Sequence, residues 1–209
     1  MNTLRIWRIP YSTNVERVAL ACAHKQVAVT WVDADPADRS ALRALSGQDL
    51  VPVLEAGDGS VVADSTAILA WLEERVPEPA LWPSGPTRRA ETDIAIEWFN
   101  RVWKLPPNTI DTELGRPDPD PARIAAWAAQ MTGWLPWFED LLAERPFLLG
   151  ETLGAADLCA FPFLKYGALP LAADDGEVFH AVLAEHLALG GGYPELRAWI
   201  ARIDALPRA

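Results

Sequence analysis

In the first third of the chain, segments whose hydrophobic residues recur at every second position are followed by segments whose hydrophobic residues have helical spacing. Residues 4–7 and 27–32 alternate with a period of two, which is typical of short strands. Residues 15–22 place their apolar side chains at helical spacing. Residues 36–46 favour a second helix, which Pro36 would begin from the first-turn position that proline prefers. The pattern predicts a β-α-β-α unit.

A hairpin and a third helix complete this region. Two short apolar runs, residues 51–55 and 60–62, flank the turn residues Gly57, Asp58 and Gly59, which predicts a β-hairpin. From Ser65 onward, the apolar residues return to helical spacing. The order βαβα followed by ββα suggests a thioredoxin-like domain.

A proline-rich segment separates this region from an all-helical one. Residues 76–87 contain four prolines and one glycine between two helical patterns, which marks a domain boundary. The later patterns predict helices over residues 88–104, 121–144, 154–169, 177–189 and 194–206. We expect Pro106–Pro107 to end the first of these helices, and Gly133 and Pro136 to bend the second.

The sequence therefore predicts an α+β fold in two domains. We expect the thioredoxin-like βαβ-ββα domain in residues 1–77, a linker in residues 78–87 and the all-helical domain in residues 88–209.

Charge and composition narrow the possible partners. The chain has 18 basic and 29 acidic residues and a net charge of −11. This charge disfavours nucleic acid and anionic membrane surfaces, because both attract basic proteins. The start lacks a signal peptide pattern, and the chain lacks an apolar run long enough to span a bilayer, so we expect a cytoplasmic protein.

The cysteines and histidines do not have the spacing of metal ligands. Cys22 and Cys159 lie far apart in apolar surroundings, which favours buried thiols over a disulfide. His24, His180 and His186 are expected at the surface or at helix ends. We therefore expect no metal site.

Five segments, in order along the chain, resemble those of the soluble glutathione transferases that use a catalytic serine. They are Ser12–Leu20 (STNVERVAL), Leu50–Leu54 (LVPVL), Ala63–Ile68 (ADSTAI), Leu149–Asp157 and Tyr193–Trp199 (YPELRAW). The resemblance implies a bacterial-type enzyme that binds glutathione as co-substrate in its first domain. It implies no metal or organic prosthetic group.

Ser12 is the predicted catalytic residue. It lies between the first strand and the first helix, where unpaired backbone N–H groups and the helix dipole stabilise an anion. A thiolate is such an anion, and a hydroxyl that donates to it favours the ionised form. The alternative is an ordinary serine cap. Residues 9–15 contain no cysteine, which excludes a dithiol mechanism. The neighbouring Tyr11 is a weaker candidate for the contact with the sulfur.

Pro52 interrupts a strand-like run, where a proline cannot donate to the ladder. A cis peptide bond would turn the Val51 backbone outward, whereas the alternative is a trans proline on an edge strand. The resemblance implies that Val51 pairs with the cysteinyl part of glutathione. It also implies a glutathione contact by Gln48, although two residues more than usual separate Gln48 from Pro52.

Asp64 and Ser65 begin the third helix of the first domain. Ser65 can present its hydroxyl and N–H to a carboxylate at a helix N-terminus, and Asp64 can accept from an ammonium group. The free α-amino acid end of glutathione needs both groups. The alternative is simple N-capping. A similar capping role, by Asp157 with Gly154 in the place of the usual serine or threonine, is expected in the second domain.

The resemblance also implies an apolar pocket for a small electrophile, to which we assign Tyr11 and Trp98, and a symmetric homodimer. Trp98 belongs to an aromatic set expected mostly in the core. Three alternatives stay open: the same scaffold with another low-molecular-weight thiol, a non-catalytic binding or carrier protein, and an isomerase or reductive enzyme.

Overall fold

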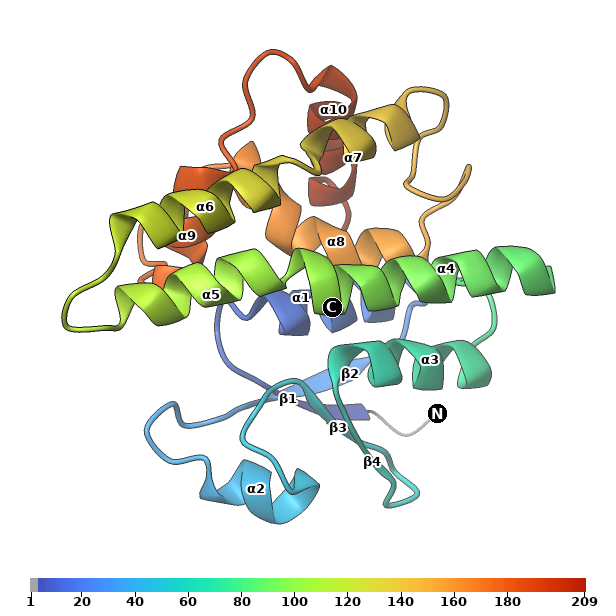
Figure 1. Ribbon diagram of the computed structural model, residues 1–209. Helices are drawn as coiled ribbons and strands as arrows, with labels where there is room; N and C mark the ends of the chain where they lie inside the picture. Colours follow the sequence, from blue (N-terminus) through green and yellow to red (C-terminus); the bar gives the residue numbers. More distant parts are fainter. Residues whose placement is uncertain (1–3) are drawn as a thin grey trace. The chain divides into compact units, whose positions relative to one another are not determined.

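A four-stranded mixed sheet with the order β2-β1-β3-β4 forms the centre of the first unit in the computed structural model (Figure 1). The structure describes residues 4–209. The four strands are β1 (Leu4–Arg8), β2 (Val29–Asp33), β3 (Val53–Glu55) and β4 (Val61–Ala63). β1 pairs in parallel with β2 and antiparallel with β3, and β3 pairs antiparallel with β4.

Three helices cover this sheet. α1 (Thr13–His24) and α3 (Ser65–Arg75) lie on one face, and α2 (Ser40–Ser46) lies on the other (Figure 1). The apolar side chains at helical spacing face the sheet because this removes them from water. The residues that are fully buried in this core include Ile6, Val18, Leu54, Ile68 and Leu69. The predicted order of strands and helices is confirmed.

α2 begins later than expected. The sequence favoured a helix from Pro36, whereas the structure begins it at Ser40. The Asp35 carboxylate accepts the N–H of Ala37, and the Asp38 carboxylate accepts the N–H of Ser40. These local bonds hold residues 35–40 in turns, which compete with the first helical turn.

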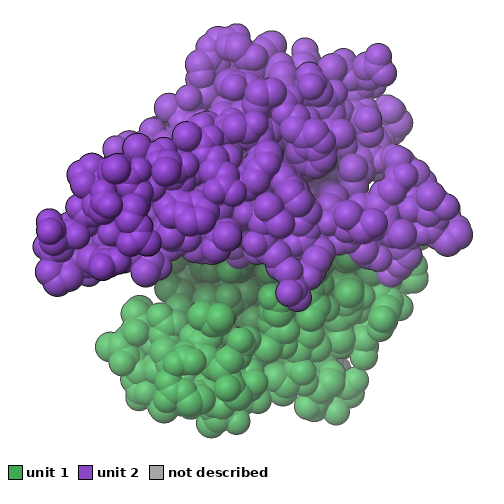
Figure 2. All heavy atoms as spheres, viewed as in Figure 1, with its two compact units in different colours: residues 1–82, 206–209 green, residues 83–205 purple. Residues whose placement is uncertain are grey.

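The chain divides into two compact units, residues Met1–Trp82 with Leu206–Ala209 and residues Pro83–Ala205 (Figure 2). The last four residues therefore belong to the first unit, although we expected them in the helical domain. Trp31 Nε1 donates to the carbonyl of Ala209, and Arg208 forms an ion pair with Glu16 at 2.9 Å. These contacts attach the end of the chain to β2 and α1.

The second unit is helical. Its helices are α4 (Pro86–Trp98), the π-helix η1 (Phe99–Trp103), α5 (Leu105–Leu114), α6 (Pro121–Thr132), α7 (Leu135–Leu142), α8 (Ala155–Leu164), the 3₁₀-helix η2 (Lys165–Gly167), α9 (Val178–His186) and α10 (Pro194–Asp204). Every residue of α8 is buried, so this helix forms the centre of the unit. We predicted one helix over residues 121–144 with a bend at Gly133 and Pro136, whereas the structure divides it into two helices: Gly133 is the C-cap of α6, and Pro136 lies in the first turn of α7.

Pro106 and Pro107 do not end a helix, contrary to our expectation. They lie in the first turn of α5. Backbone N–H groups in the first turn have no carbonyl partner within the helix, so a proline there costs no intrahelical hydrogen bond. The irregularity lies just before them, in the π-helix, where the N–H of Lys104 donates to the carbonyl of Phe99 at 3.0 Å. The wider turn of a π-helix accommodates the disturbed ladder upstream of the prolines.

The cysteines and histidines are placed as follows. Cys22 and Cys159 are buried thiols, and burial raises the pKa of Cys22 to about 12. His24 and His186 lie in the last turns of α1 and α9, as expected. His180 differs: it is buried, with its Nδ1 at 2.8 Å from Asp175 Oδ2. The burial of His180 involves its contact with Asp175, five residues earlier, which the spacing of apolar residues in the sequence does not reveal.

Residues 4–209 contain neither a membrane-spanning helix nor a cluster of metal-ligating side chains. Within this range, no helix has both the length and the apolar character needed to cross a membrane. Nor does this part of the chain bring together three or more His, Cys, Asp or Glu side chains as a metal ion would require.

Candidate active site

The strand register brings the predicted glutathione-site residues of the first unit to one edge of its sheet. Trp7 at the end of β1 pairs with Val53 at the start of β3, and Val53 pairs with Ala63 at the end of β4. β1 and β4 therefore end at the edge where β3 begins. α1 and α3 follow β1 and β4, so both helices begin at this edge.

Ser12 is the N-cap of α1. Its Oγ accepts the N–H of Val15 at 3.4 Å, and its carbonyl accepts the N–H of Glu16. A hydroxyl that accepts one hydrogen bond still has its own proton to donate. Ser12 is half-buried, while Tyr11 before it is 41% exposed and has a positive φ of 63°. The capping role that we kept as the alternative is thus present, and it is compatible with donation to a ligand.

The peptide bond between Val51 and Pro52 is cis, as the sequence predicted. β3 begins at Val53, so Val51 lies two residues before the ladder. Val51 packs against a small core cluster that contains Leu42 of α2 and Val53. The packing of Val51 against this cluster therefore connects its backbone to α2.

Gln48 lies in the loop between α2 and β3. Gly47 is the C-cap of α2, and its φ of 76° is the left-handed conformation that glycine adopts without a steric penalty. Ser46 Oγ accepts the N–H of Gln48 at 3.4 Å and donates its single proton to the carbonyl of Leu42 at 2.9 Å, with the carbonyl of Gln48 as a second acceptor at 3.2 Å. These bonds fix the backbone of Gln48, whose side chain is half-buried.

Asp64 caps α3. Its Oδ1 accepts the N–H groups of Thr66 at 2.8 Å and Ala67 at 3.2 Å, the second and third residues of the helix. Asp64 has a φ of 81°, which costs about 1 kcal/mol or more for a residue other than glycine. Ser65, the first residue of α3, is only 2% exposed, whereas Asp64 is exposed.

The sequence analysis missed Arg17. This residue of α1 is 1% exposed, and its Nη1 donates to Ser65 Oγ at 3.3 Å. Its only sequence signal is a basic residue close to the apolar positions 15 and 18.

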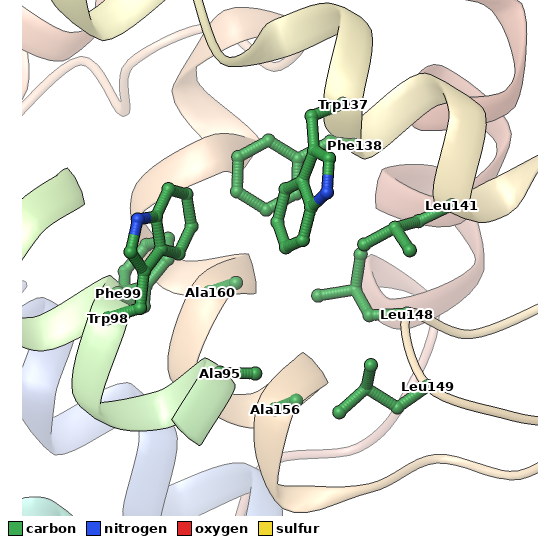
Figure 3. A pocket seen from close by; sticks show the side chains of 10 residues that line it. All are labelled: Ala95, Trp98, Phe99, Trp137, Phe138, Leu141, Leu148, Leu149, Ala156 and Ala160. Atoms are coloured by element: carbon green, nitrogen blue, oxygen red, sulfur yellow. The ribbon is translucent and has the colours of Figure 1, made fainter. Parts of the chain in front are cut away.

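An apolar cavity of about 550 Å³ opens in the second unit, where Trp98 of α4, Trp137 of α7 and Leu149 line it. Figure 3 shows an adjoining pocket with the same three residues, in which the two indole rings and the leucine side chains border the same space. The centroids of the two indole rings are 4.9 Å apart. Trp98 is half-buried and lines this cavity. Tyr11, the other residue that we assigned to the electrophile pocket, lies in the first unit.

The fold and this edge of the sheet define a thioredoxin-like domain followed by a helical domain. Two family models match: the glutathione S-transferase N-terminal domain over residues 7–80 and the glutathione S-transferase C-terminal domain over residues 121–202. The chain belongs to the glutathione S-transferase family and is a glutathione transferase-like enzyme.

Individual relatives agree with this assignment. A maleylacetoacetate isomerase from Pseudomonas aeruginosa is 28% identical over 169 residues, which cover 77% of this chain and 80% of the relative. A maleylpyruvate isomerase from Ralstonia sp. is 48% identical over 138 residues, which cover 59% and 61%. A crystal structure of the theta class glutathione S-transferase from Xanthomonas axonopodis pv. citri, with glutathione bound, has a TM-score of 0.73 and 27% identity, and covers 99% of this chain and 95% of that chain.

Proposed function

We propose that the chain binds glutathione along the described sheet edge of the first unit and transfers its thiolate to a small apolar electrophile. The observation that carries this proposal is the register row Trp7–Val53–Ala63. It collects Ser12, the cis-proline turn and the start of α3 at one edge. Two helix N-termini there favour anions, and glutathione offers a thiolate and a carboxylate.

Ser12 is proposed to stabilise the thiolate. Its hydroxyl would donate to the sulfur while its oxygen still accepts from Val15. Donation to the charged form lowers the thiol pKa, so more of the bound thiol is ionised near neutral pH. In the transfer, the sulfur forms a bond to carbon, the leaving group departs with its electron pair, and the thiol proton passes to solvent.

The peptide part of glutathione is assigned to the other residues of this edge. The Val51 backbone, just outside the ladder, would pair with the cysteinyl part as an added strand does. The N–H of Ser65, at the start of α3, would receive the γ-glutamyl carboxylate, and Asp64 would receive the ammonium group. Gln48 is proposed as a further contact.

Tyr11 of the first unit and Trp98 of the second unit are each proposed as a contact of the electrophile. The exposure of Tyr11 beside Ser12 and the position of Trp98 on an apolar cavity support this assignment. Apolar walls with few polar groups suit a small apolar molecule.

The proposal also includes a symmetric dimer and a cytoplasmic location. Sedimentation equilibrium tests the dimer, which should have twice the mass of one chain.

A second candidate function is glutathione-dependent isomerisation. The maleylacetoacetate and maleylpyruvate isomerases among the relatives favour it. A thiolate that adds to a double bond conjugated with a carbonyl leaves a single bond free to rotate, and its departure then restores the double bond. Such a reaction regenerates glutathione, whereas conjugation consumes one molecule in each turnover. Following glutathione during turnover with either substrate class separates the two functions.

Calorimetric titration with glutathione near pH 7, in buffers of different ionisation enthalpy, tests the thiolate site. We expect wild type to bind and to release protons, Ser12→Ala to bind with less release, and Ser12→Thr to recover the release. Ser60→Ala is the matched control, because β3 and β4 join there at the opposite end of the strands; it should behave as wild type. Absence of binding at millimolar glutathione would leave the family membership intact and refute the proposed ligand.

A further inference from the structure

We propose that the apolar cavity of the second unit is a binding site for a quaternary ammonium ligand, with tryptophan rings as its walls and Glu91 as its counter-charge. All the residues that line the cavity belong to this unit. The inference goes beyond the proposed function and does not depend on glutathione. Trp98, which we also proposed as a contact of the electrophile, is one of the walls.

Three tryptophans line the cavity of about 550 Å³: Trp98 of α4, Trp134 at the N-cap of α7 and Trp137 of α7. The ring centroid of Trp98 lies 5.4 Å from that of Trp134 and 4.9 Å from that of Trp137, with interplanar angles of 78° and 61°. Figure 3 shows two of these inclined rings, Trp98 and Trp137, around the adjoining pocket. Rings that are inclined rather than stacked form the sides of a recess, and the face of an indole ring attracts a cation more strongly than that of any other side chain.

Glu91 supplies the negative charge. It lies seven residues before Trp98 on α4, so the two side chains share one face of the helix. Among the described residues that line the cavity, Glu91 is the only charged one. Arg88 Nη1 lies 2.6 Å from Glu91 Oε2, but both side chains are about half exposed, and an ion pair of this kind is weak. Glu91 can therefore also face a cation in the cavity, and the net charge of −11 favours cations over anions.

The walls favour a quaternary over a primary ammonium group. Apart from Glu91, the described side chains that line the cavity are aliphatic or indole, and an indole N–H donates rather than accepts. A primary ammonium group would lose hydrogen bonds to water there, which costs free energy. A trimethylammonium group has no N–H to leave unpaired, and its methyl groups pack against apolar walls.

Two probes of nearly the same shape isolate the role of the charge. The first is choline, and the second is its neutral isostere, in which a tert-butyl group replaces the trimethylammonium group. Tryptophan fluorescence gives both dissociation constants at one ionic strength, kept constant with NaCl. We expect choline to bind at least about tenfold more tightly than the isostere. Equal affinities, or no choline binding up to about 100 mM, would overturn the inference.

Glu91→Gln tests the counter-charge. It should weaken choline binding about threefold or more, because the attraction between the carboxylate and the cation is lost, and should change the affinity for the isostere by less than about twofold. Glu97→Gln is the matched control: Glu97 is also an exposed residue of α4 that pairs with an arginine, Arg101, and it does not line the cavity. An equal loss of choline affinity in the two variants would mean that the ligand senses only the overall charge of the chain.

Trp137→Leu tests the aromatic wall and keeps an apolar side chain in place. We expect the ratio of the two dissociation constants to fall about threefold or more, since leucine has no ring face for the cation. Trp127→Leu, at a half-buried tryptophan of α6 that does not line the cavity, should leave the ratio unchanged. A ratio that is the same in Trp137→Leu as in wild type would overturn the assignment of the ring.

A measurement on wild type does not depend on any substitution being tolerated. Nuclear Overhauser effects from the choline methyl protons to the indole protons of Trp98, Trp134 and Trp137 support the inference, whereas effects confined to other residues overturn it. A second copy of the chain seated on the cavity would make choline binding stronger on dilution of the protein, and that outcome would also overturn it. None of these experiments uses glutathione, so the proposed function is tested separately.

Discussion

Asp157 Oδ1 accepts a hydrogen bond from the indole N–H of Trp199 at 2.8 Å, and both residues are buried. The bond joins α8, the central helix of the second unit, to α10. The same carboxylate accepts the N–H of Leu148 at 2.8 Å and, through Oδ2, the N–H of Gly154 at 3.0 Å. Asp157 therefore has the structural capping role that the sequence predicted, and it also connects three segments of the second unit.

Removing the indole donor should cost stability. Trp199→Phe keeps most of the buried ring and deletes the N–H, which leaves a buried carboxylate with one partner fewer. We expect the free energy of unfolding to fall by about 1–3 kcal/mol in urea titrations, partly from this bond and partly from lost volume. Trp137→Phe, at a ring that is 43% exposed, is the control and should change stability by less than about 0.5 kcal/mol.

Asp157 also predicts a pH dependence. Burial, opposed by the three N–H donors, raises its pKa from 3.8 to about 6. A folded-state pKa above the unfolded value means that the folded state binds the proton more tightly. This contribution to stability is fully present below pH 4 and is lost as the pH rises through about 6.

The measurement is the stability difference between wild type and Asp157→Asn from pH 4 to 7. We expect wild type to lose stability relative to the variant up to about pH 6, and the two curves to run parallel above it. If wild type instead gains stability relative to the variant as the pH rises, the N–H donors outweigh burial and hold the pKa of Asp157 below its unfolded value.

The parts of the fold that follow from local chemistry were predictable. The cis peptide bond at Pro52 followed from a proline in a strand-like run, because proline has no N–H for the ladder. The start of α3 followed from Asp64 and Ser65 before an apolar periodic segment. In both cases, neighbouring residues contain the whole physical cause.

The features that the sequence did not predict depend on local hydrogen bonds that compete with helix formation, or on contacts between residues far apart in the chain. The late start of α2 results from the Asp35 and Asp38 side chains, which bond to nearby N–H groups instead of allowing a helical turn. Arg17 was not singled out from the sequence. Its hydrogen bond to Ser65 joins two residues that are 48 positions apart, and the sheet register that brings them together is a tertiary property.

The buried ion pair between Lys25 and Glu73 predicts a strong effect of breaking it. Lys25 Nζ lies 2.8 Å from Glu73 Oε2 and also donates to the carbonyls of Val76 and Pro79. Lys25→Met leaves these acceptors buried without their donor, so the free energy of unfolding should fall by about 3–5 kcal/mol. Thermal and urea unfolding check this value.

Charge reversal of the same pair is not a suitable control, because the carbonyls accept only from a donor at position 25. Arg43→Met is the better comparison, since the ion pair of Arg43 with Asp49 is exposed on both sides. It should change stability by less than about 1 kcal/mol. Similar losses in the two variants would show that burial does not set the strength of the Lys25 contact.

Two glycines of the second unit offer a matched test of close packing. A Cβ at Gly167 would lie 2.8 Å from the carbonyl oxygen of Leu187 and 3.0 Å from Leu189 Cγ, whereas a Cβ at Gly190 would meet nothing within 4 Å. The N–H of Leu189 donates to the carbonyl of Gly167 at 2.8 Å, so the two backbones cannot separate without losing this bond. Gly167→Ala should lower the free energy of unfolding by about 1–3 kcal/mol, while Gly190→Ala should leave it unchanged or raise it slightly by restricting the unfolded chain. Equal stability of the two variants in urea would mean that the segment after α9 moves away from η2 at little cost.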